Sequence, residues 1–123
     1  MKKVLIVEDD LELLALEEAM LKKEYEIATV SSGEEALEKI YDFKPDLVLL
    51  DVLLPKMSGF EVCQKVRKDP AISKLPIVML TGQDRAEALS EGFESGADMY
   101  INKPFSAKKL QAVVKAVLEK QVG

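Results

Sequence analysis

The sequence contains no histidine and no tryptophan, and it has a single cysteine, Cys63. Without histidine the chain cannot build a Ser-His-Asp triad or a histidine-rich zinc site, and it cannot itself carry phosphohistidine. One cysteine cannot form an internal disulfide, and the nearby Val62 and Val66 indicate that Cys63 packs in a core rather than acting as a reactive thiol. Any chemistry therefore depends on carboxylates, hydroxyls and amines.

Long hydrophobic runs and an excess of positive charge are also missing. No apolar stretch approaches the roughly 20 residues of a membrane helix. The first residues, Met1-Lys2-Lys3, lead directly into a predicted strand rather than into a signal peptide. The formal net charge of -5 argues against nonspecific binding to nucleic acid or to an anionic membrane. We expect a cytoplasmic protein that binds neither of them directly.

The 123 residues suit one domain with one substantial core, and no linker or repeat divides them. Short apolar runs alternate five times with helical patterns, which is typical of βα units and a parallel sheet. The runs at 3–7, 47–50 and 77–80 are almost purely apolar, as in strands covered by helices on both faces, whereas 25–30 is more mixed and suits an edge. We expect residues 1–123 to form a single domain, with no output domain visible.

Helix starts are marked by capping residues. Ser32 and Ser58 are each followed three residues later by glutamate, as in a capping box, and Ser106 is the predicted cap of the last helix. Right-handed crossovers then allow a five-stranded parallel sheet of order 2-1-3-4-5, the flavodoxin-like doubly wound (βα)5 fold. In this order the first and third strands are neighbours at the point where the strand order reverses.

Polar residues stand at the carboxyl ends of four predicted strands. Glu8-Asp9-Asp10 follow the first apolar run, Asp51 the third, Thr81 the fourth and Lys103 the fifth. Parallel strands bring these ends to one edge of the sheet. An acidic cluster, a further carboxylate, a hydroxyl and an ammonium group at one edge predict a site for a divalent cation and a phosphoryl group.

Each of these residues also has a plain structural interpretation. Asp9 or Asp10 could cap the first helix, Asp51 could cap a turn, and Thr81 and Lys103 could be ordinary surface residues. Their joint placement favours the site, because neighbouring carboxylates repel one another unless a cation intervenes, and Mg²⁺ prefers such oxygen ligands. Asp51 could then accept a phosphoryl group and form an acyl phosphate.

Over essentially its whole length the chain resembles a receiver domain of the two-component response-regulator family, in the CheY-like superfamily. The matching segments are Val4–Asp10, Asp46–Asp51 with Pro55 and Gly59, Pro76–Thr81, and Gly96–Phe105. The resemblance implies that Asp51 is the phosphoacceptor and that Glu8, Asp9, Asp51 and the backbone carbonyl of Leu53 hold Mg²⁺. It also implies a phosphoryl donor, either a histidine kinase or a histidine phosphotransfer protein, and a cis Lys103-Pro104 bond.

The resemblance further implies a switch with a protein partner or a fused output domain. Thr81 and Lys103 would bind the phosphoryl group, and Tyr100 would turn inward as the Thr81 hydroxyl moves. The surface formed by the fourth helix, fifth strand and fifth helix would carry the signal. Leu53 and Gln83, two residues beyond Asp51 and Thr81, are expected to tune the phosphoryl lifetime. The domain would be regulatory and not an enzyme, although it assists its own phosphorylation and dephosphorylation.

Two other functions stay open. One is a receiver-like scaffold that binds partners without being phosphorylated. The other, less favoured, is an Asp-nucleophile phosphatase, which would need a second aspartate where this chain has Leu53. A nucleotide-binding module is less favoured still, because neither GxGxxG nor a P-loop follows any strand. Glu12 and Glu17 are expected to be exposed charges of the first helix, and they do not identify a kinase.

Overall fold

The computed structural model describes residues 1–82 and 96–120. The elements in chain order are β1 (Lys3–Val7), α1 (Leu11–Leu21), β2 (Glu26–Val30), α2 (Gly33–Phe43), β3 (Leu47–Asp51), α3 (Gly59–Lys68), β4 (Ile77–Thr81), β5 (Met99–Asn102) and α5 (Ala107–Lys120). The predicted helix between the last two strands, and Gln83 with it, lie outside the described residues.

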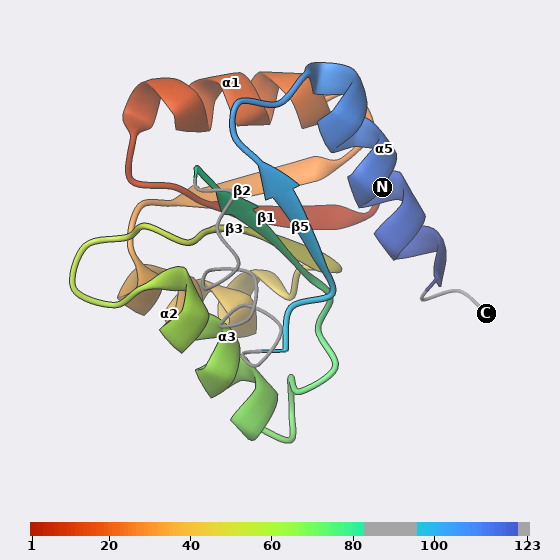
Figure 1. The fold of residues 1–123 in the computed structure, drawn as a ribbon. Helices are drawn as coiled ribbons and strands as arrows, with labels where there is room; N and C mark the ends of the chain where they lie inside the picture. Colours follow the sequence, from red (N-terminus) through yellow and green to blue (C-terminus); the bar gives the residue numbers. More distant parts are fainter. Residues whose placement is uncertain (83–95, 121–123) are drawn as a thin grey trace.

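The five strands form one parallel sheet of order β2-β1-β3-β4-β5, which confirms the predicted topology and the edge position of β2. Figure 1 shows α1 and α5 on one face of this sheet and α2 and α3 on the other. The strands β3 and β4 each extend one residue further than predicted, so that Asp51 and Thr81 are their last residues. Two candidate site residues therefore lie within the hydrogen-bonded strands of the sheet and not in the loops that follow them.

Alternating strand residues fill two separate cores. Leu5, Val7 and Leu50 lie in the core that α2 and α3 cover, whereas Ile6 and Leu49 lie in the core shared with α1 and α5. This two-sided burial explains why the central strands are apolar at almost every position. Cys63 belongs to the first core and is fully buried, as predicted.

The predicted helix caps are present. Ser32 and Ser58 accept hydrogen bonds from the backbone N–H groups three residues later, each at 3.2 Å, and the hydroxyl of Ser106 accepts one from Lys109 at 3.1 Å. Asp10 caps α1 by accepting from the N–H groups of the first helical turn. The cap directs the Asp10 carboxylate toward its own helix.

Arg67 in α3 fixes the chain that enters β5. Its guanidinium donates to the carbonyl oxygens of Leu75 at 2.6 Å and Gly96 at 2.9 Å, and to the Asp98 carboxylate at 3.0 Å. Asp98 also accepts from the backbone N–H of Ile77 at 2.7 Å, which joins the starts of β4 and β5. Gly96 has φ of 93°, a left-handed conformation that favours glycine. These contacts anchor β5, the strand that presents Lys103.

Helix α1 departs from one prediction. Glu17 is not an exposed charge but is 0% exposed, whereas Leu11 and Leu16 are 70% and 56% exposed. The physical reason is that α1 has apolar residues around most of its circumference, so the sequence pattern does not identify the face that meets the sheet. That face carries Glu17 and Leu21.

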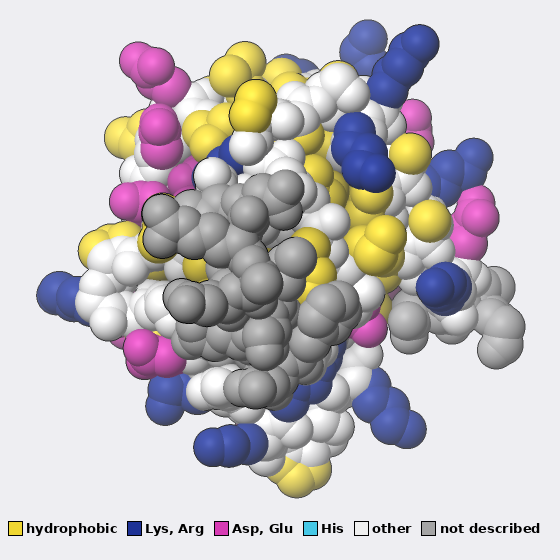
Figure 2. Space-filling model, viewed as in Figure 1, with side chains coloured by type: hydrophobic (Ala, Val, Ile, Leu, Met, Phe, Trp, Pro, Cys, Tyr) yellow, Lys and Arg dark blue, Asp and Glu magenta, His cyan; other side chains and the backbone are white. Residues whose placement is uncertain are grey.

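On the face drawn in Figure 2, the lysine and arginine side chains stand apart from one another, and several acidic side chains lie at the upper left. Among the side chains that Figure 2 draws in colour, no basic stripe of the kind that binds nucleic acid runs across this face. Among residues 1–82 and 96–120, no helix has the length and apolarity needed to cross a membrane.

Candidate functional site

Strand register brings four predicted residues to one edge of the sheet. Val7 of β1 is level with Leu50, so Glu8 emerges beside Asp51, the last residue of β3. Thr81, the last residue of β4, is level with Asn102, which Lys103 directly follows. The predicted convergence of Glu8, Asp51, Thr81 and Lys103 is therefore present.

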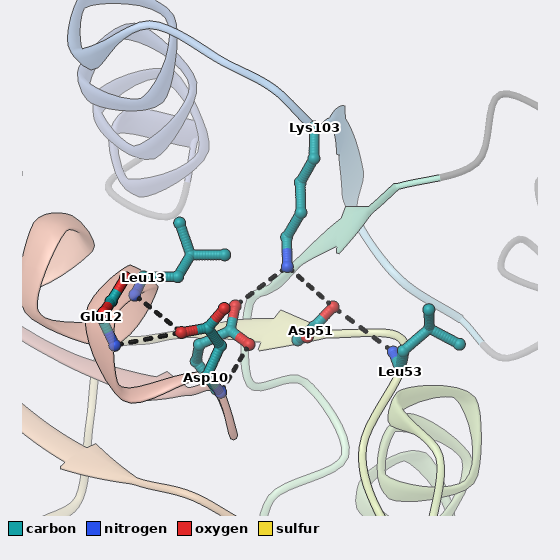
Figure 3. Close-up of polar contacts among 7 residues, drawn as sticks. Asp10, Glu12, Leu13, Asp51, Leu53 and Lys103 are labelled. Atoms are coloured by element: carbon teal, nitrogen blue, oxygen red, sulfur yellow. Dashed lines mark hydrogen bonds and ion pairs between the residues drawn. The ribbon is translucent and has the colours of Figure 1, made fainter.

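Lys103 lies between two buried carboxylates. Its Nζ is 3.0 Å from Glu8 Oε1 and 3.2 Å from Asp51 Oδ1. Figure 3 shows the extended Lys103 side chain reaching down to Asp51. The backbone N–H of Lys103 donates to the Thr81 carbonyl at 2.7 Å, and the Lys103-Pro104 bond is cis, as the resemblance implies. The ammonium group thus joins the ends of β1, β3 and β5.

Three carboxylates meet at this edge. Glu8, Asp9 and Asp51 each offer one oxygen, and these oxygens lie within 4.8 Å of one another. Glu8 and Asp51 are 1% and 4% exposed, whereas Asp9 is exposed. An oxygen-only donor set that is open on one side suits Mg²⁺, which keeps several waters and accepts few protein ligands. The described residues therefore fit a hydrated divalent cation.

Several negative charges lie close together at this site, and they shift the pKa values of its side chains. Burial raises the pKa of Asp51 to about 7, and Glu8 adds to the rise, whereas Lys103 opposes it. Burial by itself would lower the pKa of Lys103, yet hydrogen bonds and attraction to Glu8 and Asp51 raise it above its ordinary value. A divalent cation beside Asp51 would favour its ionised form for the same reason that Lys103 does.

The loop after β3 folds back so that its residues lie close to Asp51. Leu53 donates its backbone N–H to Asp51 Oδ1 at 3.4 Å, while its side chain is 63% exposed (Figure 3). Gly59 donates its N–H to the Val52 carbonyl at 2.9 Å, and a Cβ at Gly59 would collide with the Asp51 carbonyl oxygen. Glycine is needed here so that the start of α3 can approach the strand that carries Asp51.

The two predicted switch residues have different surroundings. Thr81 is 4% exposed, and among the residues that the structure describes no atom lies within 4 Å of a Cβ placed on the next residue, Gly82. Tyr100 packs against the core under α2 and α3, and its hydroxyl oxygen is shielded from solvent. Burial raises the pKa of Tyr100 to about 12. The ring is therefore turned inward.

Glu17 is a member of this neighbourhood that the sequence did not predict. Burial raises its pKa to about 8, and the negative charge of Glu8 contributes to the rise. Lys103 and Asp51 also act on it electrostatically. The sequence does not single out Glu17, because apolar residues recur on several sides of α1.

Comparison with known proteins places this geometry in a family. The family model for the response regulator receiver domain matches residues 4–115. The alkaline phosphatase synthesis transcriptional regulatory protein PhoP of Bacillus subtilis is 43% identical over 97% of this chain and 49% of its own length. The chain spans about half the length of the curated relatives it matches.

Solved structures agree with the family match. A response regulator from Chloroflexus aurantiacus J-10-fl is 42% identical, with a TM-score of 0.92 over 96% of this chain and 98% of that one. The chemotaxis protein CheY4 of Vibrio cholerae is 34% identical, with a TM-score of 0.90 over 95% and 98%. The fold agrees with these solved structures, and the chain belongs to the response regulator receiver domain family.

Proposed function

We propose that this receiver domain is a Mg²⁺-dependent switch that accepts a phosphoryl group on Asp51 from the phosphohistidine of a histidine kinase or a histidine phosphotransfer protein. The observation that carries the proposal is the position of Lys103, whose Nζ lies 3.0 Å and 3.2 Å from two buried carboxylates. An ammonium group fixed beside a nucleophilic carboxylate supplies the positive charge that a phosphoryl group needs on arrival.

The chemistry needs one new bond and one broken bond. A carboxylate oxygen of Asp51 attacks phosphorus while the phosphorus–nitrogen bond of the donor breaks, and the donor imidazole leaves with the electron pair and takes a proton. Bound Mg²⁺ would supply charge neutralisation, held by Glu8, Asp9, Asp51 and the Leu53 carbonyl. The Thr81 hydroxyl would donate to a phosphoryl oxygen, and Lys103 would pair with another.

The switch would act through β5. Thr81 and Asn102 are level on adjacent strands, and Tyr100 lies two residues before Asn102 on the same strand. Movement of Thr81 toward the phosphoryl group would change the packing around Tyr100, and thereby the surface formed by β5, α5 and the helix that the sequence predicts between β4 and β5. A coupling of 1–3 kcal/mol is typical of such two-state elements. Phosphorylation-induced amide shifts confined to the edge site would contradict this route.

Intact-protein mass spectrometry tests the proposal. The chain is incubated with acetyl phosphate in the presence of Mg²⁺, and a matched sample contains a chelator instead. One phosphoryl adduct that requires Mg²⁺ is the expected result. If neither acetyl phosphate nor a panel of phosphorylated histidine kinases gives an adduct, the phosphorylation-independent scaffold becomes the better function. Steady turnover of a phosphomonoester would instead favour the phosphatase.

We further propose that residues 1–123 act as a single regulatory domain in the cytoplasm and work through protein contacts. The relevant partner is a downstream protein or a fused output domain. Curated relatives about twice as long are named as transcriptional regulators, and for this chain we assign no nucleic-acid contact to the receiver itself. The net charge of -5 supports this assignment.

Leu53 is expected to slow the loss of the phosphoryl group. Its exposed apolar side chain stands two residues beyond Asp51 and offers no hydrogen bond to an attacking water. Leu53→Asn should therefore lose its phosphoryl group faster than the wild-type chain, by several-fold. The measurement is the decay of the phosphorylated mass after removal of the donor. Slower decay in the variant would contradict the role given to Leu53.

A further inference from the structure

A groove lies at the edge of the sheet opposite to Asp51, between the end of α2 and the chain that leads from α3 into β4. Its volume is about 700 Å³, which is within the range of ligand-binding clefts. Tyr41 and Pro45 line it from the first segment, and Ile72 and Leu75 line it from the second. Pro45 precedes β3 and Asp51 ends it, so the length of a strand separates the groove from the candidate phosphoryl site.

The two segments that form the groove are already held in place. Arg67 donates to the carbonyl oxygens of Ser73 at 3.1 Å and Leu75 at 2.6 Å, which fixes the chain that enters β4. At the end of α2, the backbone N–H of Lys44 donates to the Ile40 carbonyl at 3.0 Å. A groove with ordered walls loses little conformational entropy when it binds a ligand.

The charged side chains of the groove are both positive. Lys44 and Lys74 belong to its lining and are exposed, and none of the described residues that line it is an aspartate or a glutamate. Among residues 1–82 and 96–120, neither lysine takes part in an ion pair. Each of the two segments therefore contributes one ammonium group that can attract an anion.

The carboxylates nearest to these segments in the sequence already have partners. Asp46 accepts a hydrogen bond at 2.7 Å from the first backbone N–H of β1, and Asp69 accepts one at 3.0 Å within its own turn. Asp42 pairs with Lys39 at 3.7 Å. Exposed charges further away are screened over about 8 Å at physiological ionic strength. The negative net charge of the chain therefore does not prevent an anion from binding in the groove.

We propose that this groove binds an acidic segment of a partner protein, in which carboxylates flank one apolar side chain. The apolar side chain would pack against Tyr41, Ile72 and Leu75. The carboxylates would pair with Lys44 and Lys74, and a peptide can present more than one carboxylate to lysines on two different segments. Tyr41 is 50% exposed, and tyrosine is among the residues that contribute most to protein binding. The inference does not depend on phosphoryl transfer or on a cation.

Amide NMR spectra of the isotope-labelled chain, without Mg²⁺ or a phosphoryl donor, test the inference. The probes are three capped pentapeptides, Glu-Glu-X-Glu-Glu, in which X is phenylalanine, tryptophan or leucine. In the matched peptides glutamine replaces every glutamate. We expect at least one acidic peptide to shift the amide signals of Tyr41 and of residues 71–75. It should bind about five-fold more tightly than its glutamine counterpart, because two exposed ion pairs are lost with the carboxylates.

Lys44→Gln combined with Lys74→Gln should weaken binding of the acidic peptide by about five-fold, for the same reason. The control is Lys108→Gln combined with Lys115→Gln, which makes the same change in net charge on α5, on the opposite face of the sheet (Figure 1). The control should bind the peptide within about twofold of the wild-type affinity, because distant exposed charges are screened.

The inference would be overturned if none of the three acidic peptides shifted the groove amides, or if acidic and glutamine peptides bound equally well. Equal losses in the two double variants would overturn it too. Groove signals that moved with protein concentration alone would assign the groove to a second copy of the chain. Equally tight binding of phenylpropionate would assign it to a small aromatic acid, and either result would replace the acidic segment. All of these results leave the proposed phosphoryl transfer to Asp51 unaffected.

Discussion

Asp51→Asn is expected to take up no phosphoryl group and yet to be more stable than the wild-type chain in metal-free solution at pH 8. The amide cannot act as the nucleophile, so the mass adduct should be absent at any Mg²⁺ concentration. The gain in stability has a separate cause, which is the burial of the Asp51 carboxylate next to Glu8. Removal of that charge should raise the free energy of unfolding by on the order of 3 kcal/mol.

The pH dependence of this gain follows from the raised pKa. In the folded chain the Asp51 carboxyl has a pKa of about 7, against an ordinary value of 3.8. Between these values the folded chain holds a proton that the unfolded chain has lost, so the free energy of unfolding falls as the pH rises through this range. The asparagine variant lacks this dependence, and its advantage over the wild-type chain should be smaller at pH 5 than at pH 8.

Denaturant unfolding at pH 5 and pH 8, with a chelator present, measures both effects. The control is Asp42→Asn, which changes the same carboxyl to the same amide on the exposed face of α2, where the side chain is 81% exposed. Its stability should change by less than about 1 kcal/mol. A variant of Asp51 that is less stable than the wild-type chain at pH 8, or equally improved at both pH values, would contradict this account.

The sequence predicted the sheet and its edge residues because the signals for them are local. Purely apolar runs identify strands that are buried on both faces, and the residue that ends each run must lie at the carboxyl edge. The positions of Asp51 and Thr81 follow from these two facts alone. The caps at Ser32, Ser58 and Ser106 were equally local, since each depends on a hydroxyl and an N–H group three residues away.

The sequence did not predict which side of α1 faces the sheet. A helix with leucines on several sides has no single apolar stripe, so its rotation is decided by contacts with residues distant in the chain. Here that rotation buries Glu17 beside Glu8 and leaves Leu16 in solvent. The partners of Lys103 were also inaccessible to local patterns, because the ion pair with Glu8 joins residues 95 positions apart. The positions of the motifs indicated that Lys103 and Glu8 lie at the same edge of the sheet, but they did not show that the two side chains are in contact.

Lys103→Met is expected to have opposite effects on cation binding and on phosphoryl transfer. In the wild-type chain the ammonium contacts Glu8 and Asp51, two of the three carboxylates that would hold Mg²⁺. Without this positive charge the carboxylates should attract a divalent cation more strongly, and Mg²⁺ affinity should rise several-fold at pH 8. Phosphoryl uptake should nevertheless slow by about 10²–10³-fold, since a fixed donor for the transferred group is lost.

Two measurements on the same protein decide this prediction. Mg²⁺ affinity is obtained by calorimetry, and the rate of adduct formation is followed by mass spectrometry at saturating Mg²⁺, so that weaker or tighter cation binding cannot influence the rate. Lys115→Met, an exposed lysine of α5, controls for the change in net charge. If Lys103 only held the strand ends together, its loss would loosen both carboxylates, and affinity and rate would fall in parallel. A rise in affinity with a fall in rate requires that Lys103 opposes the cation and assists the phosphoryl group.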